Sequence, residues 1–365
     1  MDFFDTHISE EAIKMVTKTL KSSYISAGKI ASEFEDSIEK KLQIENAVSV
    51  NSCTSALHLG LTLMNLKKGD EVILPAQTFI ASGLSILMAG ATPIFADINY
   101  KTGNINPNSI EEKLTRKTKA IMVVHYGGLP CDMDEICKIA SKHKLFVIED
   151  AAHAFGSTYR KKPIGSISDF TAFSFQAIKQ LTTGDGGIII CKSKKNYQRA
   201  KKLRWFGIDR EKSKASYLGE RVFDVNEIGF KYHMNDISAS LGIANLKSFS
   251  KRLKRVKQIA SSYREEFSKI SDIDLLDNPK DRENSYWLYP LHVKGRKAFI
   301  KKMLSESIPV SVVHQGIDRF SVFGGKQNAL VNQRRFDKTQ ISLPIHPALV
   351  DEDVKRIIQA VKRGW

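Results

Sequence analysis

A lysine followed by a glycine-rich turn is the feature of this 365-residue sequence that most directly indicates chemistry. The β-prone run 169–175 precedes Lys179, and the turn TTGDGG at 182–187 follows it, before the apolar run 188–191. Glycines in such a turn let the backbone pass close to a flat ligand, where a Cβ would collide with it. A lysine that is partly withdrawn from water loses its proton more easily and can attack a carbonyl carbon. The ordinary alternative is a solvated lysine in a hairpin loop.

A carboxylate and a histidine follow a second apolar run. Residues 145–148 are all apolar, and Asp150 and His153 come just after them. A carboxylate at the end of a buried strand must be paired or hydrogen-bonded. Asp150 could cap the next turn, or it could pair with a protonated ring nitrogen, as an aspartate does in pyridoxal phosphate enzymes. His153 could reach the same ligand, or it could be a hydrogen-bonded core histidine.

Small hydrogen-bonding residues occupy the start of a predicted helix. The run NSCTS at 51–55 precedes the helix-forming segment 56–64. Free N–H groups at a helix start favour a phosphate, although capping of the helix alone would explain the same residues.

Alternation of strand-like and helix-like segments sets the expected fold. Such a pattern predicts an α/β protein with a mostly parallel sheet, helices on both faces, and a site at the carboxyl ends of the strands. The expected strands are 48–50, 71–74, 94–97, 120–124 and 145–148, with helices at 79–89, 107–115 and 132–143 between them.

The pattern of expected secondary structure changes in the C-terminal third of the chain. The segment 205–225 is a long polar loop, and two helices, 237–244 and 247–269, are expected after it. The sequence therefore predicts a large domain at 1–246 and a smaller α+β domain at 247–365. The elements expected in the smaller domain are strands at 287–293 and 310–313 and helices at 297–305 and 350–362.

Composition limits the partners and the compartment. The net charge is +16, but the lysines are scattered through helical segments, so nucleic acid is not favoured and a basic DNA-binding regulator remains only an alternative. Four cysteines without paired spacing indicate a reduced cytoplasm and no metal site, and no export signal is visible. The uncharged run 72–96 is long enough to span a membrane, but its prolines and glycine break it into short elements.

Six motifs in register resemble one family, the DegT/DnrJ/StrS-type nucleotide-sugar aminotransferases. The resemblance implies a pyridoxal-phosphate-dependent transferase of fold type I, like aspartate aminotransferase, with a mainly parallel seven-stranded sheet, a smaller C-terminal domain and a homodimer with sites at its interface. The motifs are NSCTSA at 51–56, GDEVI at 69–73, VIEDAAHA at 147–154, FSFQAIK at 173–179, TTGDGG at 182–187 and GFKYHMND at 229–236.

The same resemblance assigns roles to individual residues. Lys179 would form the Schiff base with pyridoxal 5'-phosphate, and Asp150 would pair with the pyridinium nitrogen. His153 would approach the phenolic oxygen, and Phe79 would stack on the ring. The phosphate would be held by Thr54, Ser55 and Ser174, and from the neighbouring subunit by Lys231, where many relatives have asparagine.

The activity implied by the resemblance is transfer of an amino group from L-glutamate to a nucleotide-linked keto-deoxy sugar. We expect a 4-keto-6-deoxyhexose as the acceptor, for surface polysaccharide or glycan biosynthesis. A sugar 3-aminotransferase or a 3-dehydratase of the same fold is the alternative, but such dehydratases carry histidine at the position of Lys179. Substrate choice is expected to depend on loops 22–29, 205–225 and 314–323.

Overall fold

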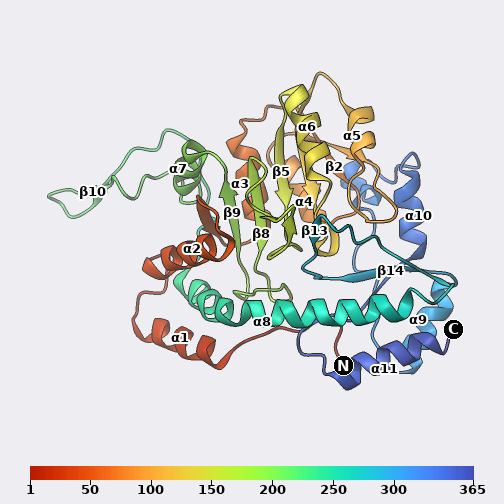
Figure 1. Ribbon diagram of the computed structural model, residues 1–365. Coiled ribbons are helices and arrows are strands. Elements are labelled where there is room, and N and C mark those ends of the chain that lie inside the picture. Colours follow the sequence, from red (N-terminus) through yellow and green to blue (C-terminus); the bar gives the residue numbers. More distant parts are fainter.

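A seven-stranded sheet forms the centre of the computed structural model, which describes residues 1–365 (Figure 1). Neighbouring strands are parallel except for β9, which runs antiparallel to β1 and β8. The predicted mainly parallel sheet is therefore confirmed. In sheet order the strands are β1 (Ala47–Val50), β9 (Gly187–Cys191), β8 (Phe170–Ser174), β5 (Phe146–Asp150), β4 (Thr118–Val124), β2 (Glu71–Pro75) and β3 (Thr92–Ala96).

Helices cover both faces of this sheet, which explains why its strands are apolar along their whole length. Side chains alternate between two hydrophobic cores: in β5, Val147 belongs to one core and Ile148 to the other. One core includes side chains of α3 (Cys53–Leu63), α4 (Ile80–Met88) and α7 (Lys194–Leu203). The opposite core includes side chains of α2 (Lys29–Leu42), α5 (Pro107–Lys113), α6 (Met133–His143) and α8 (Asp236–Phe267).

One continuous helix, α8, replaces the two helices predicted for 237–244 and 247–269. Asn245 lies between the two predicted helices and is fully buried and hydrogen-bonded: its Nδ2 donates to the carbonyl of Thr182 and its Oδ1 accepts from the N–H of Ser9. Because tertiary partners satisfy that side chain, the helix continues. The predicted domain boundary at 246 falls inside α8, so the division into 1–246 and 247–365 stays a prediction.

The C-terminal part contains a three-stranded antiparallel sheet, β12 (Ile273–Leu275), β14 (Tyr289–Val293) and β15 (Gln340–Leu343). The strand predicted at 310–313 was wrong, since only Ser311 forms a bridge there, with Ser342. Val313 has a φ of 58°, which ends the extended run. The helices of this part are α9 (Arg296–Ser305), α10 (Val331–Thr339) and α11 (Asp351–Lys362), with short 3₁₀ turns η2 (Ile317–Arg319) and η3 (Ser321–Phe323).

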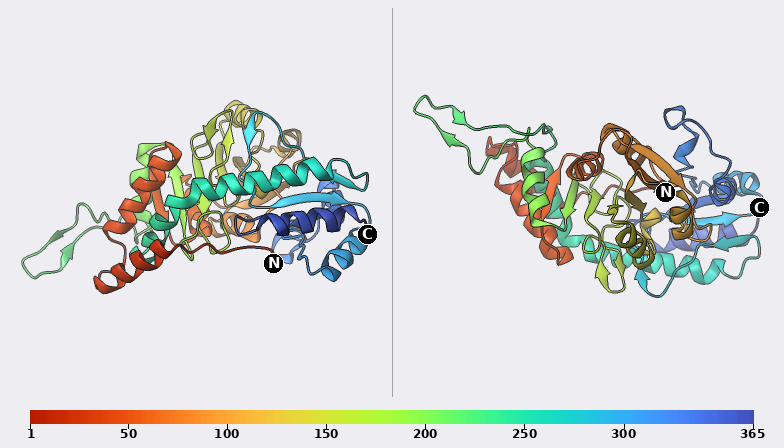
Figure 2. Two further views of the ribbon diagram at one scale, coloured as in Figure 1. Left: turned by 60° about the horizontal axis from the view of Figure 1, so that its bottom comes forward. Right: turned by 90° about the horizontal axis from the view of Figure 1, so that it is seen from above.

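The remaining elements are small or peripheral. Within the predicted loop 205–225, β10 (Lys214–Ala215) and β11 (Arg221–Val222) form a hairpin that projects from the body of the molecule (Figure 2). None of the helices combines the length and the apolar character needed to cross a membrane. The other small or peripheral elements are α1 (Glu10–Lys21), η1 (Tyr126–Gly128) and a three-stranded sheet of β6 (Thr158–Tyr159), β7 (Lys162–Pro163) and β13 (Arg282–Glu283).

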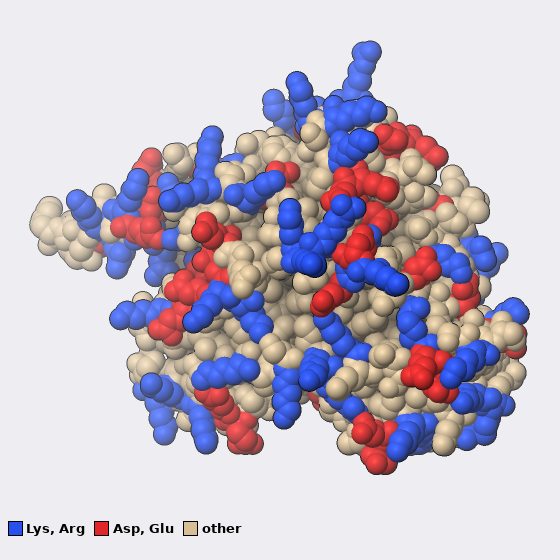
Figure 3. Space-filling view, viewed as in Figure 1, with Lys and Arg blue, Asp and Glu red and all other residues tan.

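Basic side chains are dispersed over the molecular face shown in Figure 3, where acidic side chains lie among them. Many charged side chains of the molecule are paired, as in Lys257 with Glu283 and Arg160 with Asp134. On this face the excess positive charge is therefore distributed, as the scattered lysines of the sequence predicted.

Candidate active site

Lys179 lies in the turn that follows β8, where its N–H donates to the carbonyl of Gln176 at 2.9 Å. Its Nζ is 3.4 Å from the centroid of the Trp287 ring. Burial lowers the pKa of this amine to about 7, although the nearby Cys53 and Asp150 act in the opposite direction. Near neutral pH a large fraction of the amine is thus unprotonated, which is the form that attacks a carbonyl carbon.

Asp150 ends β5 and is only 5% exposed. Its Oδ2 accepts a hydrogen bond from the hydroxyl of Ser82 at 2.6 Å, and its Oδ1 accepts from the N–H of Ala152 at 3.1 Å. Burial raises the pKa of the carboxyl, against these hydrogen bonds and the charge of Lys179. Since both hydrogen-bond donors are neutral, the carboxylate still has capacity for a cationic N–H donor.

A stack of rings borders these two residues. The ring of His153 lies 3.8 Å from that of Trp287 at an interplanar angle of 18°, and its buried Nδ1 has no hydrogen-bond partner. Burial and the charge of Lys179 hold the pKa of His153 well below its usual range, so its ring is neutral. Phe79, the residue before α4, is 55% exposed and offers an apolar ring face.

The start of α3 forms a cradle of backbone N–H groups. Ser52 caps the helix by accepting from the N–H of Ser55 at 3.1 Å, and Thr54 lies in the same first turn. Gly187 packs directly against this turn, because a Cβ there would lie 2.5 Å from the carbonyl carbon of Ser52. Ser174 pairs with Gly187 across β8 and β9. The start of a helix with hydroxyls beside it suits a phosphate group.

Lys231 lies next to the same segment through its backbone. Its carbonyl accepts from Nδ2 of Asn51 at 3.3 Å, and it forms a bridge with Trp205. The side chain is exposed. Contact with a phosphate across a subunit interface stays a prediction for this residue.

Three side chains of the site were not identified from the sequence. Ser82 lies within the uncharged run 72–96, Trp287 begins the predicted strand 287–293, and His314 begins the predicted loop 314–323. The hydroxyls of Thr78, just before α4, and Ser82, in its first turn, lie 2.7 Å apart and were a usable signal, because hydroxyls four residues apart at the start of an apolar helix indicate a buried polar partner. Nothing comparable marks Trp287 or His314, which come from distant parts of the chain.

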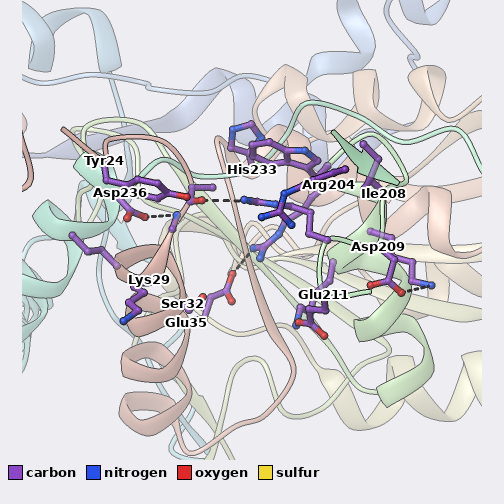
Figure 4. A pocket seen from close by; sticks show the side chains of 18 of the residues that line it. Tyr24, Lys29, Ser32, Glu35, Arg204, Ile208, Asp209, Glu211, His233 and Asp236 are labelled. Carbon is purple, nitrogen blue, oxygen red and sulfur yellow. Dashed lines mark hydrogen bonds and ion pairs between the residues drawn. The ribbon is translucent and has the colours of Figure 1, made fainter. Parts of the chain in front are cut away.

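A cavity of about 720 Å³ does not include Lys179, Asp150 or His153. It lies where loop 22–29 meets residues 204–211, and Tyr24, Arg204 and His233 line it together with charged pairs such as Arg204 with Glu35 (Figure 4). Lys179 itself borders a cavity of about 40 Å³. The reactive groups are therefore recognised by their chemistry, while the large cavity brings together two of the three loops predicted to govern substrate choice.

Comparison with known proteins agrees with this geometry. A model of the DegT/DnrJ/EryC1/StrS aminotransferase family matches residues 6–362. The spore coat polysaccharide biosynthesis protein SpsC of Bacillus subtilis is 36% identical over 97% of this chain and 94% of its own length. GDP-perosamine synthase of Escherichia coli O157:H7 is 32% identical over 96% of this chain and 94% of its own. The crystal structure of AtS13 from Actinomadura melliaura has a TM-score of 0.96 at 32% identity, covering 100% of this chain and 99% of that one.

The mainly parallel sheet and the structural relatives define a pyridoxal-phosphate-dependent transferase of fold type I. More specifically, the chain belongs to the DegT/DnrJ/EryC1/StrS aminotransferase family. The prediction of a nucleotide-sugar aminotransferase from the sequence motifs is thereby confirmed, and the DNA-binding alternative is not favoured.

Proposed function

We propose that this protein moves the amino group of L-glutamate onto a nucleotide-linked keto-deoxy sugar, with a 4-keto-6-deoxyhexose as the acceptor. The observation that carries the proposal is a buried amine of lowered pKa, Lys179, close enough to the buried carboxylate of Asp150 for each charge to favour the other. The relatives support the substrate class, since one is named a GDP-perosamine synthase and another a spore coat polysaccharide biosynthesis protein. We place the reaction in the cytoplasm, in surface polysaccharide or glycan assembly.

The residues present fit pyridoxal 5'-phosphate. The unpartnered Nδ1 of His153 and the incompletely paired carboxylate of Asp150 match the polar edge of a pyridine ring, and the cradle at Thr54, Ser55 and Ser174 matches a phosphate. When bound, this group supplies an aldehyde for the lysine and a ring that accepts electrons.

Lys179, Asp150 and Phe79 have separate roles in the proposed reaction. Lys179 Nζ, once free, would take the proton from the α-carbon of the donor and deliver it to the carbon on the other side of the amino nitrogen, and it would repeat this in reverse on the sugar. Asp150 keeps a proton on the ring nitrogen, because a buried carboxylate without a cationic partner favours an N–H⁺ beside it. Phe79 holds the ring in orientation through its exposed face.

An absorbance spectrum tests the proposal. We expect the purified protein to bind pyridoxal 5'-phosphate, to show a near-ultraviolet to violet band, and to retain the cofactor on Lys179 after borohydride reduction and peptide mass mapping. Loss of that band with L-glutamate, and its return with one member of a panel of UDP-, dTDP- and GDP-linked keto-sugars, would identify the substrate. A chain that leaves Lys179 unmodified would contradict the proposal.

We also propose a homodimer in which Lys231 serves the neighbouring site. Mixing and reassociating inactive Lys179→Ala and Lys231→Ala chains tests this. If the lysine acts across the interface, a mixed dimer contains one intact site and regains activity. If it acts within its own chain, both sites of the mixed dimer stay defective.

A further inference from the structure

The loop that carries His314 is fixed from three directions. The carbonyl of His314 accepts from Nε2 of Gln77 at 3.0 Å and from Nε2 of Gln340 at 2.7 Å, and its N–H donates to the carbonyl of Val312 at 2.7 Å. Gln77 precedes α4, and Gln340 begins β15. Two parts of the chain far apart in sequence therefore hold one histidine backbone in place.

The residue before it is strained. Val313 has a φ of 58°, and a β-branched side chain rarely adopts this left-handed conformation. Such strain persists only where surrounding contacts enforce it, and it concentrates at functional sites. The double anchor on the next carbonyl supplies that enforcement, so the local geometry serves to aim the His314 side chain.

The ring of His314 lies among the aromatic rings beside Lys179. Its centroid lies 5.6 Å from that of Phe79, 5.6 Å from that of His153 at an angle of 4°, and 6.0 Å from that of Trp287. Its Nε2 is buried and has no hydrogen-bond partner. A buried polar atom without a partner is unfavourable, so Nε2 of His314 is free to form a hydrogen bond with a ligand.

The charge state of the His314 ring indicates which kind of ligand group it can bind. Burial and the nearby Lys179 lower the pKa of His314 to about 4, so the imidazole is neutral near pH 7. A neutral imidazole is a poor partner for the carboxylates of an amino acid donor, which favour cations. It is a good partner for a hydroxyl, which can donate or accept and so satisfies either tautomer.

We propose that His314 determines specificity for the amino acceptor, with its Nε2 hydrogen-bonded to an oxygen of the hexose. This inference rests on the proposed function, and it concerns the sugar rather than the cofactor, whose polar edge is already matched by Asp150 and His153. The histidine would thus act in one of the two half-reactions and be nearly silent in the other.

Single-turnover absorbance measurements separate the two half-reactions. For His314→Ala, we expect the rate with L-glutamate to stay within about twofold of the wild type, while kcat/KM for the keto-sugar falls about 10- to 100-fold. His314→Gln, whose amide can also donate and accept, should recover part of the loss. The exposed His143, at the end of α6, provides a matched control as His143→Asn.

Three outcomes would overturn the inference. Equal losses in both half-reactions would assign His314 to the cofactor, and unchanged sugar kinetics would leave it a packing residue. If the loss of kcat/KM for the keto-sugar is fully explained by a lower melting temperature or a lower cofactor content of the variant, His314 has a structural role. A wild-type enzyme that reacts with L-glutamate but with no keto-sugar would instead refute the proposed function.

Discussion

Two adjacent carboxyl groups of β5 lie on opposite faces of the sheet and have contrasting surroundings. Glu149 accepts hydrogen bonds from Nε2 of His125 at 2.8 Å and from the hydroxyls of Ser168 and Thr171. Burial opposes its charge, but these partners outweigh burial and the pKa is lowered. Asp150 has only two hydrogen-bond donors, Ser82 and Ala152, and its pKa is raised.

The contrast separates a carboxylate that stabilises the fold from one available for chemistry. The Nδ1 of His125 accepts from the N–H of Cys131 at 3.0 Å, so Nε2 carries the proton donated to Glu149, and that network is complete. On the Asp150 face, Nδ1 of His153 and Nε2 of His314 have no partners. Complete pairing indicates structure, whereas incomplete pairing around a buried charge indicates a ligand site.

The largest effect is expected from Lys179→Ala, which removes the reactive amine and leaves both carboxylates in place. We expect transamination to fall at least about 10,000-fold, because covalent attachment and proton transfer are both lost. Sheet packing does not depend on this amine, so circular dichroism should be unchanged. Full turnover by this variant would mean that the face of Asp150 is not the active one.

Asp150→Asn should come next, with a fall in kcat of about 100- to 1,000-fold. The amide keeps the shape of the side chain but cannot hold a proton on a ring nitrogen. Because a buried charge without a cationic partner is removed, the melting temperature without cofactor should stay equal or rise. A clearly lower melting temperature would show that Asp150, like Glu149, is structural.

Glu149→Gln should have the opposite effects to Asp150→Asn, with lower stability and nearly unchanged kcat. We expect a loss of about 1–3 kcal/mol in the free energy of unfolding at pH 7, with kcat per folded site nearly unchanged. A carboxyl whose folded pKa is lowered stabilises the protein above its unfolded pKa of about 4.3, and this contribution is lost as the pH falls through the folded pKa. Denaturant titrations should therefore show the difference between variant and wild type shrinking below about pH 4.

Ser82→Ala should give the smallest change, a decrease of about 3- to 10-fold in kcat, because one of the two hydrogen bonds to Asp150 is lost. The acidic limb of the pH–rate profile should move to higher pH, since Asp150 loses a bond that favours its charged form. Ser82→Thr restores the hydroxyl and serves as the control. An unmoved acidic limb would argue that the hydroxyl only fills space.

Local sequence predicted much of the fold and the reactive pair. Asp150 follows an apolar strand, and Lys179 lies between a strand and a glycine turn, so each could be found from its neighbours. Long-range pairing could not be found this way. The sequence predicted two helices where α8 is continuous. Between the two predicted ranges, Asn245 is buried and hydrogen-bonded to Thr182 and Ser9, which are distant in the chain.

Residue types and their order determined the alternating strands and helices, the position of Lys179 between a strand and a glycine-rich turn, and the family, since these depend on local propensity and on motifs contiguous in the chain. Tertiary structure alone decided that the carboxylate of Glu149 has a full set of hydrogen-bond partners and that of Asp150 does not. It also brought Ser82 to Asp150, and Trp287 and His314 to Lys179. The physical reason is that burial and hydrogen-bond satisfaction depend on partners brought together by folding, and a residue's immediate neighbours do not encode them.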